Sequence, residues 1–283
     1  MTLSAIAIRE AAEADLPAIV ALRHEVGWHA FEWALRDAMR PPHGHFLVAD
    51  DAGRVVGCGS ALDYGPLGVI GNMVVTASQR RRGLGAEILR RLLAFLRERG
   101  CRTVELYATA AGRPLYEGHR FRVVSAGMLM TVPASALGAA SPGGIQNGDA
   151  RHLPELAAYD APRFGGDRSR LLGAALTDPL RPVLVARNGG AVRGYAVIRP
   201  DGVRLGPWVA DTPDDAATIL SGAFQLTGSE TLTTNIASDN RPGVAWLSGI
   251  ASEVQRHDGR MRLGPPAARR AETLYGTTVG ALG

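Results

Sequence analysis

The run Arg80-Arg81-Arg82-Gly83-Leu84-Gly85 has residue types and spacing that indicate chemistry. It follows an apolar stretch at residues 69–75 and leads into an amphipathic one. Glycines let a ligand approach the backbone closely, and the free amide groups of a helix N-terminus favour phosphate oxygens. Arginine side chains can add charge-assisted hydrogen bonds. The pattern therefore predicts a turn that binds a small phosphate-bearing molecule.

Other phosphate-binding motifs do not fit this turn. The sequence has no Gly-Lys-Ser/Thr at this place, and its glycine spacing is not Gly-x-Gly-x-x-Gly with an acid about 20 residues on. The alternative interpretation is a basic helix start that is merely solvated. Solvation alone does not require two glycines between a strand and a helix, so we favour the phosphate site.

The composition is that of a globular protein. Hydrophobic residues make up 46% of the 283 residues and charged residues 20%, and the formal net charge is +4. A modest charge gathered in one arginine cluster argues against a nucleic-acid partner. The two cysteines are too few for a disulfide framework, and no stretch has the length and character of a membrane span. We expect a cytoplasmic protein that binds neither nucleic acid nor membrane, and the composition leaves its oligomeric state open.

The elements that would hold the turn alternate between strands and helices. Asp15 before Leu16-Pro17 is an N-cap signal for a helix, and Pro41-Pro42 should end a second one. Four strands are expected around residues 4–8, 46–49, 55–62 and 69–75. A long helix at 83–99, a strand at 102–108, a short helix at 114–118 and a strand pair around 121–132 follow. This order predicts an α/β fold with a mixed sheet.

The pattern partly repeats in the second half. Residues 134–144, which are rich in Ser, Gly, Pro and Ala, have no apolar period and suggest a linker. Helices are then expected at 153–159, 167–176, 214–224 and 239–247, and strands at 183–186, 192–198, 203–209 and 231–236. We predict two similar domains, 1–134 and 145–283, joined by a linker at 135–144.

The segment from Met73-Val74-Val75 through Gly85 resembles the acyl-CoA signature of the GNAT N-acetyltransferase superfamily. A second segment, Ala108-Thr109-Ala110-Ala111-Gly112-Arg113-Pro114-Leu115-Tyr116-Glu117, resembles a tandem-GNAT subgroup that includes the holothin N-acyltransferase type. Three later runs resemble the C-terminal domain of that subgroup: Arg163 to Arg168, Leu205 to Ala210 and Arg260 to Gly264. The chain departs from the subgroup at Tyr107, where Asp is usual, and at Arg120-Phe121, where Gly-Phe is usual. Any acid role at position 107 is thereby put in doubt.

This resemblance implies the donor and several site residues. The co-substrate would be acetyl-CoA or another acyl-CoA, with its pyrophosphate on the turn from Arg80 to Gly85. The strand backbone at Met73, Val74 and Val75 would line the pantetheine arm, and Tyr116 would give a proton to the departing thiolate. A phenol is protonated at neutral pH and can serve in this way. A half-buried packing residue is the alternative for Tyr116.

The acceptor side is less readable. His24, Trp28 and Asp63 are candidate substrate contacts, because the ends of the first helix and third strand plausibly flank the acceptor. Asp63, His24, Glu25 and His29 are the candidate general bases, and an already neutral amine would need none. Trp28, Phe31 and Trp33 have core packing as the favoured role and an apolar acceptor pocket as the alternative. His24 with His29, and His43 with His45, could suggest a metal site. No acid or cysteine stands at a spacing that would complete the ligand set, so no metal is expected.

The second domain has a different turn. Its strand at 203–210 leads into Asp211-Thr212-Pro213-Asp214-Asp215, so acids stand where phosphate would bind. Acids suit a helix N-terminus as caps but would repel pyrophosphate. We predict one acyl-CoA per chain, bound by the first domain. The activity implied is acyl transfer to a primary amine of a small molecule; the alternatives are a protein N-acetyltransferase and a non-catalytic acyl-CoA sensor.

Overall fold

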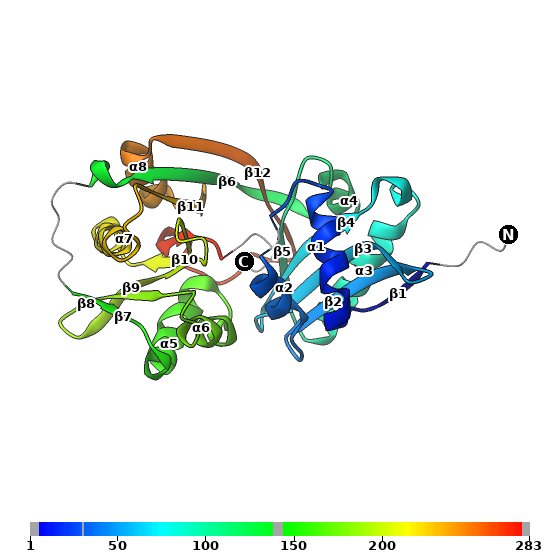
Figure 1. Ribbon diagram of the computed structural model, residues 1–283, viewed down its shortest axis with the longest axis horizontal. Helices are drawn as coiled ribbons and strands as arrows, with labels where there is room; N and C mark the ends of the chain where they lie inside the picture. The colour runs from blue at the N-terminus through cyan, green and yellow to red at the C-terminus, as the bar shows by residue number, and fades with distance from the viewer. Residues whose placement is uncertain (1–5, 30, 138–143, 279–283) are drawn as a thin grey trace. The chain divides into compact units, whose positions relative to one another are not determined.

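The computed structural model describes residues 6–29, 31–137 and 144–278, apart from the side chain of Asp258 (Figure 1). The chain divides into two compact units. Of the described residues, the first unit takes those up to Arg122 and the segment Arg262–Pro266. The second takes those of Val123–Met261 and those that follow from Ala267.

The first unit is a mixed sheet with helices. Its strands, in spatial order, are β1 (Ala7–Glu10), β2 (Gly44–Asp51), β3 (Arg54–Asp63), β4 (Leu67–Val75) and β5 (Thr103–Tyr107), and the end of β12 (Glu253–Leu263) borders β5. Neighbours from β1 to β4 are antiparallel, and β4 and β5 are parallel. The helices are α1 (Leu16–His24), α2 (Glu32–Met39), α3 (Leu84–Glu98) and α4 (Arg113–Gly118), with 3₁₀ turns η1 (Glu13–Asp15) and η2 (Ala77–Gln79).

Two glycines of β3 let α3 lie close to the sheet. A Cβ atom at Gly59 would come within 2.8 Å of Ile88 and 2.5 Å of the Met73 sulfur, and one at Gly57 would meet Ile88 at 3.5 Å. Because successive strand residues face opposite sides, Cys58 lies on the other face of β3. Close packing of α3 places its N-terminus beside the end of β4.

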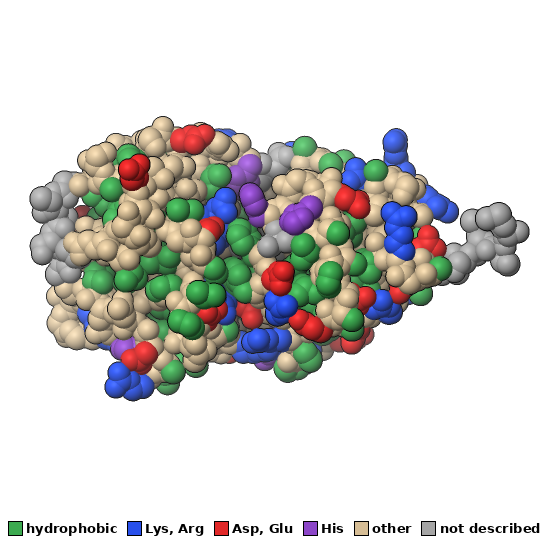
Figure 2. All heavy atoms as spheres, in the orientation of Figure 1, with side chains coloured by type: hydrophobic (Ala, Val, Ile, Leu, Met, Phe, Trp, Pro, Cys, Tyr) green, Lys and Arg blue, Asp and Glu red, His purple; other side chains and the backbone are tan. Residues whose placement is uncertain are grey.

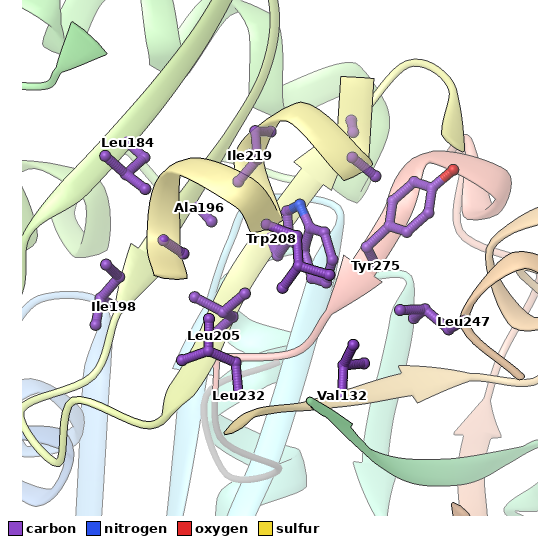
Figure 3. Close-up of a cluster of buried hydrophobic side chains, with 14 of the residues drawn as sticks. Val132, Leu184, Ala196, Ile198, Leu205, Trp208, Ile219, Leu232, Leu247 and Tyr275 are labelled. Carbon is purple, nitrogen blue, oxygen red and sulfur yellow. The ribbon is translucent and has the colours of Figure 1, made fainter. Parts of the chain in front are cut away.

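The second unit repeats the strand–helix–strand plan. Its strands, in spatial order, are β6 (Arg122–Pro133), β11 (Thr231–Ala237), β10 (Arg204–Ala210), β9 (Ala191–Ile198), β8 (Val183–Asn188) and β7 (Ile145–Asn147), with β13 (Leu274–Gly276) paired to β10. The helices are α5 (Leu153–Phe164), α6 (Ser169–Leu176), α7 (Pro213–Thr227) and α8 (Arg241–Ile250), with 3₁₀ turns η3 (Ala134–Ala136), η4 (Ala150–His152) and η5 (Ala271–Thr273). Trp208, Ile219 and Tyr275 pack together in its core (Figure 3).

The predicted mixed α/β fold is confirmed, and several details of the prediction are wrong. One strand, β6, runs where a strand pair was expected, and β7, β12 and β13 were not foreseen. Asp15 is the N-cap residue of α1, as expected, but its carboxylate makes no capping hydrogen bond to that helix and pairs with Arg9 at 2.7 Å. Part of the expected linker, residues 138–143, lies outside the described residues. The domain boundaries at 134 and 145 stay a prediction.

Candidate active site

Strands β4 and β5 are paired only along the first part of β4. The parallel ladder runs from Leu67 opposite Thr103 to Ile70 opposite Leu106. β4 itself continues to Val75, whereas β5 ends at Tyr107. In the described chain, this ladder does not extend to the backbone from Met73 to Val75. The side chains of Met73 and Val75 are half-buried. An extended ligand can therefore hydrogen-bond to this part of β4 as a strand would.

A β-bulge lies at the start of this segment. Gly71 is opposite Ser60 and Val74 is opposite Cys58, so Asn72 and Met73 together face the single residue between them on β3. Asn72 has φ 56°, in the left-handed region that asparagine tolerates. Its amide nitrogen donates to the Ser60 hydroxyl at 2.9 Å. Bulges re-aim the backbone and are frequent beside active sites. This one begins two residues after Ile70, the last residue of β4 that pairs with β5.

Arg23 of α1 holds the bulge from the other face of β3. Its Nη1 atom donates to Asn72 Oδ1 at 2.5 Å, and Nη2 donates to the His29 carbonyl at 2.7 Å. The guanidinium carbon lies 5.3 Å from the ring centroid of Trp28. Burial lowers the pKa of Arg23. Sequence reasoning found Trp28 but missed Arg23 and Asn72, although an asparagine within the apolar run of β4 was a signal.

The turn between β4 and α3 has the backbone that the phosphate prediction requires. Gly83 is the N-cap residue of α3 with φ 82°, and Arg81 has φ 58°. No side chain in the described part of the chain caps this helix, which leaves its first amide groups for a ligand. Arg80 donates to the Val75 carbonyl at 3.0 Å, and Arg82 donates to Gln79 at 2.6 Å. All three predicted arginines thus stand at the end of β4.

Glu87, an acid in the first turn of α3, is paired with two arginines of the same helix. Glu87 accepts hydrogen bonds from Arg90 at 2.6 Å and from Arg91 at 2.8 Å. These two arginines hold the pKa of Glu87 at about 2. Their charges offset the carboxylate that would otherwise weaken anion binding at this helix end.

Gly83 and Gly85 are glycines for different reasons. Gly83 adopts a left-handed backbone that favours glycine, with open space where a Cβ would stand. Gly85 has no positive φ, and a Cβ there would meet Leu115 of α4 at 3.6 Å, an ordinary contact. The fold alone therefore does not require glycine at position 85.

Tyr116 follows Leu115 on α4, so the packing of α4 near the start of α3 brings a phenol to this part of the unit. Its ring is buried, with 6% of the residue exposed, and lies edge-on to Phe121 at 6.0 Å. The hydroxyl has no hydrogen bond to any residue that the structure describes. Burial raises its pKa to about 12, so it keeps its proton at neutral pH.

The other predicted contacts are not all brought to the bulge. His24 and Glu25 are exposed at the end of α1, whereas Trp28 lies against Arg23. Asp63 is opposite Gly68, four residues before Asn72 along β4, and its carboxylate accepts from the Gly65 amide at 2.7 Å. The structure thus ties Trp28 to the bulge and places Asp63 in a turn at the other end of β3.

Aromatic contacts link the remaining residues of the α1–α2 connection. His29 lies 6.2 Å from Phe31 and Phe31 lies 6.4 Å from Trp33, between ring centroids. Trp33 and Phe31 are half-buried. Within the described chain, no three His, Cys, Asp or Glu side chains are grouped as a metal ion would need.

The equivalent turn in the second unit is capped by the protein itself. Thr212 accepts from the Asp215 amide at 3.1 Å and donates its hydroxyl proton to the Asp215 carboxylate at 2.6 Å. Asp211 pairs with Arg163 at 2.6 Å and with Arg193 at 3.2 Å. The expected acids stand at this turn, and arginines offset part of their charge. The Thr212 cap is the stronger obstacle to a phosphate.

In the second unit, strand β13 occupies the position beside β10 that corresponds to the free edge of β4 in the first unit. β10 and β11 pair in parallel only at Arg204–Thr233 and Leu205–Thr234. Beyond that point β13 pairs with β10, and the Thr277 amide donates to the Asn235 carbonyl of β11 at 2.9 Å. Figure 3 shows Tyr275 of this segment beside Trp208. The chain's own backbone therefore takes the place that a ligand could take along β4.

Charges of both signs are mixed on the protein surface. On the face shown in Figure 2, arginine side chains stand among acidic ones and form no single basic field. Arg36, for example, pairs with Glu13 at 2.8 Å and with Glu32 at 2.9 Å. No described helix is long and apolar enough to cross a membrane.

Comparison with known proteins assigns the two halves to one family. A model described as Acetyltransferase (GNAT) family matches residues 7–120, and one described as Acetyltransferase (GNAT) domain matches residues 156–276. The chain belongs to the GNAT acetyltransferases and carries two such domains in tandem. This family uses acyl-CoA, so the class is that of acyl-CoA-dependent transferases.

Individual relatives agree with that class. A Bacillus subtilis (strain 168) protein described as the uncharacterized N-acetyltransferase YitH is 26% identical over 175 residues, 60% of this chain and 61% of the relative. The match thus spans less than two thirds of the relative's length. A putative acetyltransferase from Pyrococcus horikoshii has a similar fold, with a TM-score of 0.81, 24% identity and coverage of 100% of this chain and 98% of that one. A GCN5-related N-acetyltransferase from Sphaerobacter thermophilus gives a TM-score of 0.63 at 20% identity, with 98% of each chain covered.

Proposed function

We propose that the first domain transfers an acetyl or other short acyl group from acyl-CoA to a primary amine of a small molecule. The observation that carries this proposal is the free edge of β4 from Met73 to Val75, which leads directly to the uncapped start of α3. A strand edge suits the amide groups of pantetheine, and a helix N-terminus suits pyrophosphate. The two features are adjacent along the chain, as one extended ligand requires.

The turn from Arg80 to Gly85 would hold the phosphates through backbone amides and arginine side chains. Arg80 and Arg82 already have neutral partners, the Val75 carbonyl and Gln79, so neither loses an ion pair when an anion binds. Leu84 begins the helix and contributes its backbone amide. The absence of a side chain at Gly85 would let a phosphate reach that amide.

Acyl-CoA would supply a thioester whose carbonyl lies near the bulge. The backbone from Met73 to Val75 would line the pantetheine and orient that thioester, because β4 is there free of β5. Tyr116 would donate a proton to the departing thiolate. Its raised pKa means that the proton is present throughout the neutral range, which a proton donor requires.

The acceptor would enter from the face that carries α1, where Trp28 lies against Arg23. Of the four candidate bases, His29 is the one whose backbone the Arg23 contact ties to the bulge. His24 and Glu25 stay exposed, and Asp63 is held in a turn. An amine that is already neutral at working pH would need no base. The resemblance to the holothin N-acyltransferase type suggests a specialised metabolite as the acceptor. Cytoplasmic location is part of the proposal, because Cys58 and Cys101 are free thiols.

The test is a screen of small amines, peptides and proteins with acetyl-CoA and longer acyl-CoAs, read by release of free thiol and by mass spectrometry of products. We expect acylated small amines, with turnover that depends on Tyr116. Products formed only on lysine or N-terminal amines of proteins would favour the protein acetyltransferase. Tight acetyl-CoA binding without any amine-dependent thiol release would favour the sensor.

A further inference from the structure

Arg23 is a half-buried cation whose side chain has no acidic partner among the described residues. Its two hydrogen bonds go to neutral acceptors, the Asn72 side chain and the His29 carbonyl. Its Nε atom is buried and has no hydrogen-bond partner. The charged neighbour with most influence on it would be the Cys58 thiol, but burial raises the pKa of that thiol to about 12, so it is neutral. Among the described residues, no acid offsets this positive charge.

The same chain shows how a buried arginine is usually satisfied. Arg168 in the second unit is buried, and both its Nε and Nη2 atoms donate to the Asp160 carboxylate, at 2.9 and 2.6 Å. A guanidinium fits a carboxylate through two parallel hydrogen bonds of this kind. A buried charge without such a partner is costly and is retained where function uses it. Arg23 lacks what Arg168 has.

The position of Arg23 relates that missing partner to the reaction. Its guanidinium bonds directly to Asn72, and Asn72 shares the bulge with Met73, where the free edge of β4 begins. The guanidinium carbon lies over the Trp28 ring, 5.3 Å from its centroid. An anion that accepts from the remaining guanidinium N–H groups would thus stand within one side-chain length of the backbone that orients the thioester.

We propose that Arg23 binds a carboxylate of the acceptor, so that the substrates are amino carboxylates, small molecules that carry both the reacting amine and a carboxylate. This inference rests on the proposed acyl transfer. A carboxylate matches the single positive charge of Arg23, whereas a phosphate would call for further cations at the same place. Asn72 then has two roles, because it holds the bulge and keeps the guanidinium directed toward the acceptor.

The experiment compares acceptors with and without the carboxylate: phenylalanine, glycine and glutamate with their α-carboxamides, and phenethylamine as the decarboxylated form of phenylalanine. With wild-type protein and acetyl-CoA, we expect kcat/KM to be at least about tenfold higher for an amino acid than for its carboxamide. In Arg23→Gln this preference should vanish, because the KM for the acid should rise by more than the KM for the carboxamide. Arg23→Lys should keep part of the preference. Arg54→Gln, an exposed arginine of β3, is the matched control and should behave as wild type.

Direct binding gives a second reading, which does not need turnover. Calorimetry with N-acetylphenylalanine and its carboxamide should show tighter binding of the acid to wild type and equal binding to Arg23→Gln. Wild type that uses carboxamides as well as acids would overturn the inference and leave acyl transfer intact. Equal losses with all acceptors in Arg23→Gln, together with weaker acetyl-CoA binding, would instead make Arg23 a residue that only positions the bulge. Absence of thiol release with every amine, despite acetyl-CoA binding, would overturn both proposals.

Discussion

Gly276 of β13 lies directly opposite Trp208 of β10 in an antiparallel ladder. A Cβ atom at position 276 would come within 2.5 Å of the Thr234 hydroxyl and 3.2 Å of the Trp208 Cβ, so the segment fits its slot without room to spare. The slot beside β10 corresponds in topology to the free edge that β4 has beside β5 in the first unit. The occupied strand edge distinguishes the second domain from the first more clearly than the difference between their strand-to-helix turns does.

One acetyl-CoA should therefore bind per chain. Strand β13 takes the strand edge in the second domain, and Thr212 caps the helix that would receive the phosphates. Calorimetric titration of the full chain measures the stoichiometry. Two coenzymes per chain, or acetyl-CoA bound along β10, would contradict this division of labour.

Replacing Gly85 by Ala should weaken acetyl-CoA binding by about tenfold or more, because the methyl group would stand where a phosphate approaches the backbone. Stability should not fall, since the Cβ would meet Leu115 at an ordinary 3.6 Å. Gly249→Ala in α8 is the control, with nothing within 4 Å of its Cβ. Unchanged acetyl-CoA affinity in Gly85→Ala would mean that the phosphates do not bind at the backbone of position 85.

Tyr116→Phe should lower kcat by about a hundredfold while leaving the acetyl-CoA affinity near that of wild type. A lost proton donor acts on the transition state more than on binding. Folding should be little affected, because the hydroxyl has no hydrogen bond to the described residues. Single-turnover kinetics with acetyl-CoA isolates the chemical step. Rates within a few-fold of wild type would return Tyr116 to a packing role.

The pH dependence of Tyr116 has a defined sign. Burial raises its pKa to about 12, above the ordinary value near 10. The stability that comes from its neutral form is complete below pH 10 and is lost as the pH rises toward 12, because the unfolded chain ionises first. Denaturant unfolding of wild type and Tyr116→Phe from pH 8 to 11.5 should show a loss specific to wild type above pH 10. Parallel curves would show that the ring is more hydrated than its 6% exposure indicates.

Arg120→Gly should stabilise the protein by about 0.5–1 kcal/mol. Arg120 is exposed and has φ 68°, a left-handed backbone that costs a non-glycine residue about 1–2 kcal/mol. The added freedom of glycine in the unfolded chain offsets part of that gain. Chemical denaturation measures the difference, with Arg54→Gly as a control at an exposed residue that has no positive φ. A loss of stability would mean that the arginine side chain has contacts worth more than the backbone strain.

Short sequence patterns predicted many of the elements of the first domain. Glycine and arginine spacing predicted the turn between β4 and α3, because such spacing reflects backbone freedom and charge within a few residues. Apolar periodicity predicted α3 and the central strands for the same reason. The Tyr116 assignment came from a resemblance of the surrounding segment, and its role stays a prediction. Strand β13 was missed because three residues are too few for a periodic signal.

The residue order of this chain was enough to predict a turn suited to phosphate, a mixed α/β fold and a likeness between its halves, since these depend on neighbours along the chain. Tertiary structure decided which groups meet. Arg23 and Asn72 are 49 residues apart, yet they share one hydrogen bond at the bulge. Tyr275 comes from the far end of the chain, yet it packs against Trp208 of β10. Contacts of this kind depend on strand register and on packing across many residues, which no short pattern encodes.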